Sequence, residues 1–278
     1  MIRLDYYIRR KTGVSPQNFK NWWTGLHADL WRNHAETLGI RRHVQLVGDP
    51  ENPIGIGYRK AYDATGEPFD GLATTCWADI RILQAALETP AGQVAYQEIL
   101  ADELGHIDTS RCRLSFGVNH AVIFPREKIE ATKETDYTRV AYFPDALPDL
   151  VIPEVHRHWI AVHGGLTQDY APNSPNAKYI QVHCCENELA SRMRTDRNMA
   201  KNDRHFGHAE VWTSPADQER AANNPRRQEL FPLYIEDIEN FADSRTGYLL
   251  AGKDHYVVNN EIYTSPLPKP RLGYLGAE

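Results

Sequence analysis

The residues best suited to chemistry in this sequence are two histidines that stand in the same local pattern. The pattern W-x3-H-x2-L occurs at Trp23, His27 and Leu30 and again, 136 positions later, at Trp159, His163 and Leu166. Both histidines fall on the apolar stripe of an expected amphipathic helix. An imidazole among apolar rings tends to have a lowered pKa, which suits a general base near neutral pH. His163 is therefore the first candidate for a proton acceptor, and His27 is its counterpart.

A structural role is the alternative for both histidines. Each could be a core side chain that hydrogen-bonds to a backbone carbonyl and is kept for packing. A duplicated structural residue would recur at the same spacing as a duplicated catalytic one. The repeat therefore indicates a duplicated unit of about 135 residues and leaves both roles open.

A second pair of histidines stands in the last expected strand of each half. His120 and His255 each lie three residues after a glycine. Side chains alternate along a strand, so only one face of each strand can reach a pocket. If that face includes the histidine, an acid on the sheet and a base on the helix could flank one substrate. Exposure to solvent is the alternative.

The second half carries ionisable residues that the first half lacks. His208, Glu210 and Trp212 share one face of an expected strand, where the carboxylate can hold the histidine in one tautomer. The positions 136 residues earlier hold Leu72, Thr74 and Cys76. This difference favours an active site in the second half, with His208 or His255 and a tyrosine such as Tyr179 as proton donors. Solvated strand positions are the alternative.

The sequence is rich in aromatic residues, with 6 Trp and 14 Tyr. Such rings on the walls of a pocket would form a flat, mostly apolar cleft with a few hydroxyl groups, which suits an aromatic ligand. Ordinary core packing accounts for many of them. The residues that we expect to contact the substrate are Trp159, Trp23, His183, Trp212, His120 and Tyr7.

Motifs for metals, nucleotides and activated nucleophiles are absent. No H-E-x-x-H, C-x-x-C, G-x-S-x-G, P-loop or G-x-G-x-x-G occurs. His205 and His208 form a pair without a third ligand, and the adjacent Cys184 and Cys185 should point to opposite faces of a strand. We therefore expect no metal site and no cofactor. Haem stays open as an alternative, because a single histidine can be its axial ligand.

Composition narrows the class of partner. The 31 basic and 37 acidic residues leave a net charge of −6, which disfavours nucleic acid. No apolar run approaches 18 residues and no apolar stretch follows Met1, so we expect neither a membrane span nor a secretion signal. Four cysteines without a disulfide pattern favour the cytoplasm. A small aromatic molecule is the expected partner, and a homodimer stays open.

The spacing of apolar residues and the positions of Gly, Pro and helix-capping residues predict the elements that position these residues. Residues 2–9 alternate like a strand, and Ser15 with Pro16 opens an amphipathic helix of about five turns. The Gly- and Pro-rich segment 48–68 is expected to be a loop. The remaining elements of the first half are strands at 40–47, 71–77 and 113–123 and helices at 78–87 and 93–104.

The second half repeats this β-α-β-β-α-β order, which is the ferredoxin-like motif. Its expected elements are strands at 138–143, 177–183, 206–213 and 246–258 and helices at 153–168, 215–222 and 227–240. We place the two halves at residues 1–125 and 138–258 and an extended tail at 259–278. Packing the two uncovered sheet faces together would form an α/β barrel, so that one chain would be a fused dimer.

These motifs resemble the EthD domain of the dimeric α/β-barrel superfamily. The resemblance rests on strand residues 4–11, on Ser15, Phe19, Trp23 and His27, on the strand ending at Gln45, on residues 69–73, and in the second half on Val155, Trp159, His163, Tyr179, Gln181 and His183. It implies an α+β chain of two tandem ferredoxin-like halves with a small-molecule site between sheet and helices. Relatives include cofactor-free dehydratases, decarboxylases, aromatic polyketide cyclases and monooxygenases, and also haem proteins.

We therefore expect a cofactor-independent lyase of the dehydratase, decarboxylase or cyclase type. It would act on an aromatic or polyketide-like small molecule by histidine general acid/base catalysis. A cofactor-free or haem-dependent oxygenase is the second hypothesis, and a non-catalytic small-molecule binding protein is the third. The expected catalytic residues are His163, His27, His255, His208 and Tyr179.

Overall fold

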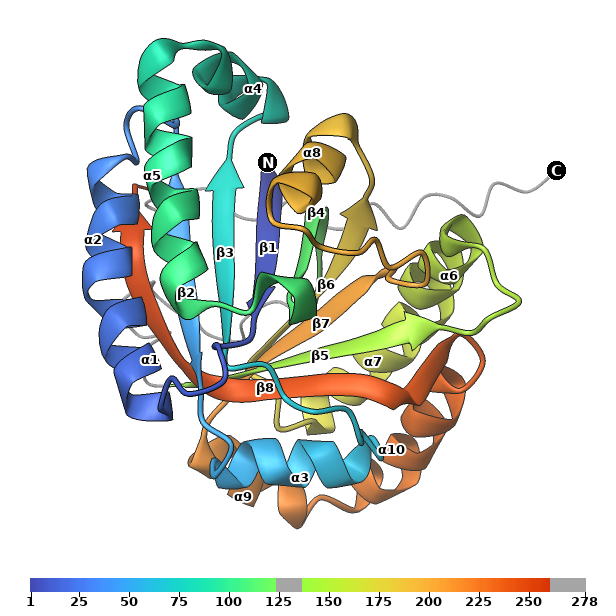
Figure 1. Ribbon diagram of the computed structural model, residues 1–278. Helices are drawn as coiled ribbons and strands as arrows, with labels where there is room; N and C mark the ends of the chain where they lie inside the picture. The colour runs from blue at the N-terminus through green and yellow to red at the C-terminus, as the bar shows by residue number, and fades with distance from the viewer. Residues whose placement is uncertain (124–136, 261–278) are drawn as a thin grey trace, which may run out of the picture.

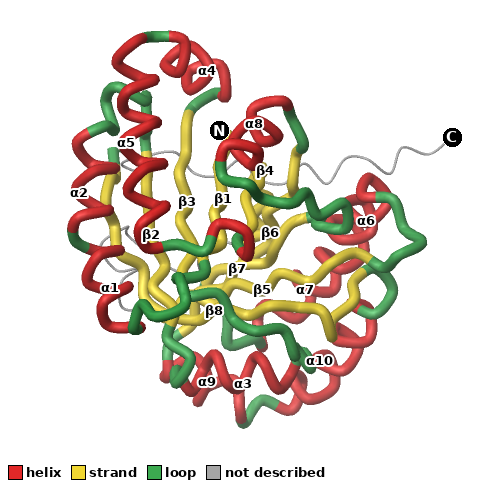
Figure 2. The backbone as a smooth tube through the Cα atoms, in the orientation of Figure 1, coloured by secondary structure: helices red, strands yellow, loops and turns green. Residues whose placement is uncertain are grey.

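The structure, a computed structural model, describes residues 1–123 and 137–260 (Figure 1). Most of the expected linker at 124–137 and of the expected tail at 259–278 lies outside these residues. The described part is a mixed α/β structure in which strands form a closed barrel and helices lie around its outside (Figure 2). The expected barrel is thereby confirmed.

Eight strands, all antiparallel to their neighbours, close the barrel in the described residues. They are β1 (Ile2–Ile8), β2 (Arg42–Gly48), β3 (Gly71–Trp77), β4 (Arg113–Ile123), β5 (Thr138–Ala146), β6 (Lys178–Cys185), β7 (Gly207–Thr213) and β8 (Ala242–Asn259). Their order around the barrel is β1-β3-β2-β8-β5-β7-β6-β4. Two seams, β2 with β8 and β4 with β6, join residues from opposite halves of the chain.

Helices cover the outer face of the barrel (Figure 1). They are α1 (Pro16–Thr24), α2 (Leu26–Asn33), α3 (Pro53–Ala61), α4 (Ile80–Glu88), α5 (Pro90–His106), α6 (Ile152–His158), α7 (Gly164–Tyr170), α8 (Glu188–Asp196), α9 (Pro215–Ala222) and α10 (Pro225–Ile238). A π-helical turn, Trp159–His163, joins α6 to α7. Within the described ranges, none of the helices combines the length and the apolar character needed to cross a lipid bilayer.

Two local expectations need correction. The segment 48–68 is not a plain loop, because it contains α3: the Asn52 side chain accepts hydrogen bonds from the first free backbone N–H groups and Pro53 opens the helix. The prediction of a loop rested in part on Gly55 and Gly57, because glycine is unfavourable inside a helix. The expected five-turn first helix is broken at Gly25, which separates α1 from α2.

The barrel interior is a second core, and it is strongly polar. Alternate residues of the strands point inward, and among them Arg3 donates to Asp5 at 2.5 Å and to Glu210 at 2.8 Å. Arg139 pairs with Glu210 and, at 3.0 Å, with Asp254. Neither guanidinium is a buried charge without a partner, because each is bonded to two carboxylates. Through the pair of Arg3 and Glu210, this network joins the two halves of the chain inside the barrel.

Candidate active site

His163 lies at the end of the π-helical turn and is buried against α10. Its Nδ1 is 3.0 Å from Oδ2 of Asp237, and the other carboxylate oxygen of Asp237 lies 2.9 Å from Nε2 of His158. Among the described residues, no protein group hydrogen-bonds to Nε2 of His163. A neutral His163 that donates Nδ1–H to Asp237 therefore presents an available lone pair on Nε2.

The imidazole of His163 borders a small cavity of about 20 Å³ between the sheet and the helices. The volume suffices for about one water molecule. Its walls are Tyr62, Tyr142, Pro144, Trp159, His163, Tyr179, Phe206, Ala209, Tyr234, Ile238 and Phe241. The buried hydroxyl groups of Tyr142 and Tyr179 have no hydrogen-bond partner at good geometry. Each such orphan costs about 1–3 kcal/mol, so the pair indicates a place for a polar ligand atom.

The local electrostatics assign different roles to these groups. Burial lowers the pKa of His163, and the hydrogen bond to Asp237 opposes that shift only in part. Burial raises the pKa of Asp237, but hydrogen bonds from His163 and His158 outweigh it and keep that pKa below its usual value. Burial raises the pKa of Tyr179 to about 12. At neutral pH the site therefore combines a neutral histidine base with protonated phenols that can donate hydrogen bonds.

His27, the counterpart of His163, has no ring nitrogen available to a substrate. Its Nδ1 is 2.6 Å from Asp102, and its Nε2 accepts a hydrogen bond of 2.9 Å from the indole of Trp31. Both ring nitrogens are thus used, which fits the structural alternative. The residue 136 positions after Trp31 is Thr167, whose hydroxyl instead donates to the backbone oxygen of His163. This one difference leaves Nε2 available in the second half.

The matching cavity of the first half is filled by an ion pair. It also measures about 20 Å³, and the carboxylate of Glu103 and the guanidinium of Arg197 line it, joined by two hydrogen bonds of 2.7 and 3.0 Å. Arg197 follows α8 and comes from the other half of the chain. In the same way, Tyr62 follows α3 and enters the His163 cavity from the other half. Each half therefore closes the other's cavity, with Arg197 in one and Tyr62 in the other.

The expected partners on β7 do not reach the His163 cavity. His208, Glu210 and Trp212 do share a face, but that face points into the barrel. His208 bridges Tyr7 Oη at 2.7 Å and Glu210 Oε1 at 2.9 Å, and Trp212 donates to Asp254. His208 and Tyr7 are therefore separated from Tyr179, which faces the helices, because neighbouring residues of a strand point to opposite sides.

The other expected site residues are divided between the halves. Trp159 lines the His163 cavity, and His183 stacks on Trp159 at 4.8 Å between ring centroids. His120 lies 4.3 Å from His183 and does not border the cavity. The remaining two, Trp23 and His255, belong to the first half's side of the barrel. Of the five expected catalytic residues, only His163 and Tyr179 share a cavity.

A metal ion fits poorly in the barrel interior. Ligand atoms of Asp5, His208 and Glu210 lie within 4.8 Å of one another. However, both carboxylates already accept hydrogen bonds from Arg3, and Glu210 also accepts one from Arg139. A cation would have to displace or face two guanidinium groups, so this donor set does not suit one.

Sequence reasoning missed three residues of the site: Asp237, Tyr62 and Tyr234. Asp237 had a detectable signal, because it stands 135 positions after Asp102 as the two histidines stand 136 apart. Tyr62 lay in the segment that was expected to be a loop. Tyr234 matches Ile99 at that spacing, so no repeat pointed to it.

Buried neutral histidines should make the protein sensitive to mild acid. Burial lowers the pKa of His183 to about 2 and holds that of His205 well below its usual value. In the unfolded chain these histidines bind a proton with a pKa of ~6.5, whereas in the folded protein they stay neutral to much lower pH. The free energy of unfolding is therefore highest above pH ~6.5 and falls as the pH drops below that value. At pH 5.5 the buried neutral His183 alone should lower the free energy of unfolding by about 1.4 kcal/mol relative to its value above neutral pH.

Urea unfolding at pH 7.5 and 5.5 measures this loss. We expect His183→Phe, which keeps the ring stack on Trp159, to lose less stability between the two pH values than the wild type. His34→Gln, which removes a less buried histidine beside Glu98, is the control for the loss of one histidine. Equal losses in all three proteins would contradict the assignment.

The comparisons with known proteins agree with this architecture. Residues 11–110 match the model of the EthD domain. An anthrone oxidase-like protein of solved structure is similar over 94% of this chain and 94% of its own, with 10% identity and a TM-score of 0.55. A candidate monooxygenase from Lactobacillus acidophilus NCFM is similar over 93% and 95%, with 7% identity and a TM-score of 0.48. No curated protein matches the chain.

The likeness to the anthrone oxidase-like protein concerns the fold alone, because the identity is low. The family match is more specific, since it covers α1 and α2 with Trp23 and His27, and the strands β2 and β3. Residues 11–110 of this chain are therefore similar to the EthD domain, as the motifs around these residues indicated.

Proposed function

We propose that this protein is an enzyme that removes a proton from an activated carbon of an aromatic small molecule, with His163 as the base. The observation that carries the proposal is a cavity lined by an Asp-oriented histidine and by two tyrosines whose buried hydroxyls have no hydrogen-bond partner. In a cavity that binds no ligand, buried polar groups are normally either hydrogen-bonded or absent. A base beside unpaired hydrogen-bond donors is the arrangement that enolate chemistry requires.

The chemistry follows from the roles of these groups. Nε2 of His163 takes a proton from the carbon next to a substrate carbonyl, and the C–H electron pair moves toward that carbonyl oxygen. The hydroxyls of Tyr142 and Tyr179 donate hydrogen bonds to the oxyanion that develops. Asp237 holds the ring and stabilises the imidazolium. In a lyase the enolate then expels a leaving group from the next carbon, and the imidazolium returns its proton to that group.

A substrate larger than water requires movement of the wall, and the helices that cover the cavity are irregular where they would move. His163 itself ends a π-helical turn. Pro232 lies inside α10, two residues before Tyr234 and five before Asp237. Both features weaken the regular backbone hydrogen bonding of a helix. We propose that these two segments open to admit an aromatic ring.

Two probes test the reaction class. 3-Hydroxy-1-tetralone should lose water across C2–C3 and yield 1-naphthol, which is followed by its fluorescence. Anthrone tests the second candidate, a cofactor-free oxygenase, because one O₂ converts it to anthraquinone and water. Naphthol release that is faster than in buffer and continues under argon supports the lyase. Quinone formation that requires oxygen supports the oxygenase.

The outcome without catalysis is equally informative. If neither probe reacts faster than in buffer, while either one binds, then the protein is a binder and the proposed reaction is wrong. An absorption spectrum of the purified protein between 380 and 450 nm separates a haem-dependent oxygenase from a cofactor-free one, since haem absorbs strongly there.

We also propose that the fold is a tandem of two ferredoxin-like halves, at residues 1–125 and 138–258. The strand order supports this, because β4-β1-β3-β2 and β8-β5-β7-β6 follow the same scheme. The helices α3 and α8 begin at asparagine caps 135 positions apart. On this view the chain is a fused dimer in which one of two equivalent cavities kept an accessible base.

A further inference from the structure

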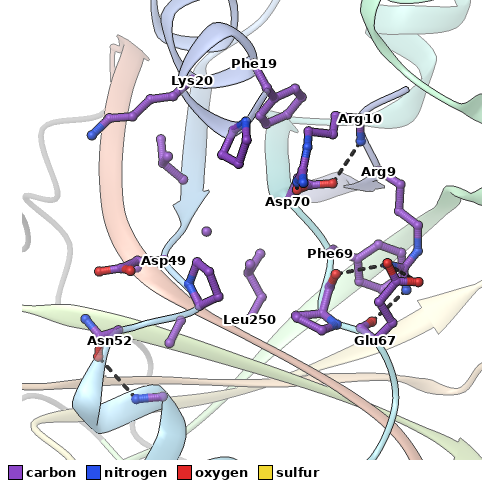
Figure 3. Close-up of a pocket in the computed structure, with 18 of the residues that line it drawn as sticks. Arg9, Arg10, Phe19, Lys20, Asp49, Asn52, Glu67, Phe69, Asp70 and Leu250 are labelled. Carbon is purple, nitrogen blue, oxygen red and sulfur yellow. Dashed lines mark hydrogen bonds and ion pairs between the residues drawn. The ribbon is translucent and has the colours of Figure 1, made fainter. Parts of the chain in front are cut away.

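A much larger cavity lies between α1 and α3, apart from the His163 cavity. It measures about 1170 Å³ and is open to solvent. Figure 3 shows Phe19 and Lys20 of α1 on one side, Asn52 at the start of α3 on the other, and Leu250 of β8 between them. We call this space the α1/α3 cleft. A cavity of this size can hold a small organic ligand.

The α1/α3 cleft is positively charged, although the chain as a whole is negative. Seven Lys and Arg residues and four Asp and Glu residues line it, in a chain with net charge −6. Arg9 and Arg111 share a single carboxylate, that of Glu67. Lys20 and Arg59 form no ion pair with any carboxylate of the described residues. The cleft should therefore attract an anion.

Buried polar groups without partners lie beside the inner end of the cleft. Gln45 is fully buried, and neither its amide nitrogen nor its oxygen has a hydrogen-bond partner. The indole N–H of Trp23 and Nε2 of His255 are also unpartnered. Gln45 pairs with His255 across the β2–β8 seam and shares its strand face with Val47, and both His255 and Val47 line the cleft. Gln45 therefore lies beside the inner end of the cleft.

The second half shows that such a glutamine can be satisfied by the protein. Gln181, 136 positions after Gln45, donates to the backbone oxygen of Trp159 at 2.9 Å and lies 3.1 Å from Nε2 of His183. The position that corresponds to His183 in the first half is Val47, which offers no hydrogen bond. The unmet hydrogen bonds of Gln45 are thus specific to this side of the barrel and require a partner from outside the chain.

We propose that the α1/α3 cleft binds a small aromatic carboxylic acid that carries a second polar group. The carboxylate lies at the cationic mouth near Lys20 and Arg59, and a hydroxyl or carbonyl at the opposite end of the ring meets Gln45 and the indole N–H of Trp23. Phe19 and Leu250 supply the apolar walls for the ring. This site is separate from the His163 cavity and does not depend on its chemistry.

Calorimetric titration with matched ligands tests the proposal. The probes are 4-hydroxybenzoate and 6-hydroxy-2-naphthoate, each with its neutral amide and its analogue without the hydroxyl group. We expect at least one acid to bind, about tenfold more tightly than its amide. Arg59→Gln should weaken the acid about fivefold and leave the amide unchanged. Gln45→Met should remove the advantage of the hydroxylated acid over the plain acid.

Two controls make the result decisive. Lys60→Gln removes a neighbouring charge that does not line the cleft, and it should leave binding unchanged. If Gln45→Met does not fold, the indole N–H signal of Trp23, identified with Trp23→Phe, should shift on titration with the acid. The proposal is overturned if no acid binds better than its amide, if Lys60→Gln weakens binding as much as Arg59→Gln, or if the Trp23 signal stays in place.

Discussion

His163→Gln is expected to lower kcat/KM for the dehydration or oxidation probe by a factor of about 10²–10⁴, the usual contribution of a general base. Glutamine keeps the size and can still hydrogen-bond to Asp237, but it cannot accept a proton at neutral pH. The fold should survive, because the substitution leaves no buried charge. Initial rates at pH 7.5, with circular dichroism to confirm folding, measure the effect.

The matched control for this experiment is His27→Gln. His27 has the same kind of aspartate partner, but Trp31 occupies its second nitrogen, so its loss should affect stability far more than rate. Asp237→Asn tests a positioning role: it should reduce kcat and lower the pH below which activity falls off, because the carboxylate raises the pKa of His163, while KM stays close to wild type. Full turnover in His163→Gln would remove His163 from the mechanism.

Glu103→Leu is expected to destabilise the protein by about 3–5 kcal/mol, the usual cost of breaking a buried ion pair. Glu103 and Arg197 form a bidentate ion pair that is buried on both sides. Removing the carboxylate leaves the guanidinium of Arg197 buried with only the hydroxyl of Tyr96 and a backbone carbonyl as partners. Urea unfolding followed by circular dichroism at pH 7.5 gives the free energy directly.

The double variant Glu103→Leu/Arg197→Met separates charge burial from packing. Replacing both partners by apolar side chains removes the uncompensated charge, so most of the lost stability should return. Arg226→Met breaks the exposed pair with Glu229 and should change stability little, because exposed ion pairs contribute little. A double variant as unstable as Glu103→Leu would show that the ion pair fills the first cavity by shape rather than by charge.

Much of the fold could be predicted because its signals are local. The alternation of strand residues, the Ser15–Pro16 helix start and the spacing of Trp23 and His27 depend on neighbours within a few positions, and the structure shows β1, α1 and α2 accordingly. The repeat indicated where a second set of elements would follow. The prediction failed at α3, because its two glycines disfavour a helix and its stability comes from the Asn52 cap and from packing on β8.

The site was predictable only in part, for a geometric reason. His163 and Trp159 sit on one helix, so their common direction follows from helical spacing. Whether His208 or Tyr179 joins them depends on which face of a strand meets the helices and which meets the barrel interior. Sequence alternation separates the two faces but does not say which is which, since both are buried here.

The sequence by itself determined the resemblance of residues 11–110 to the EthD domain, the α/β barrel and the choice of His163 as base candidate. Only the tertiary structure decided which of two matching histidines keeps an available nitrogen. Trp31 closes His27 and the pair of Glu103 and Arg197 fills its cavity, whereas Thr167 and Tyr62 leave His163 beside unpaired hydroxyls. The reason is physical: Trp31 and Thr167 act four positions from their histidines, but Arg197 and Tyr62 reach the two cavities from the other half of the chain, and only the closed barrel brings them there.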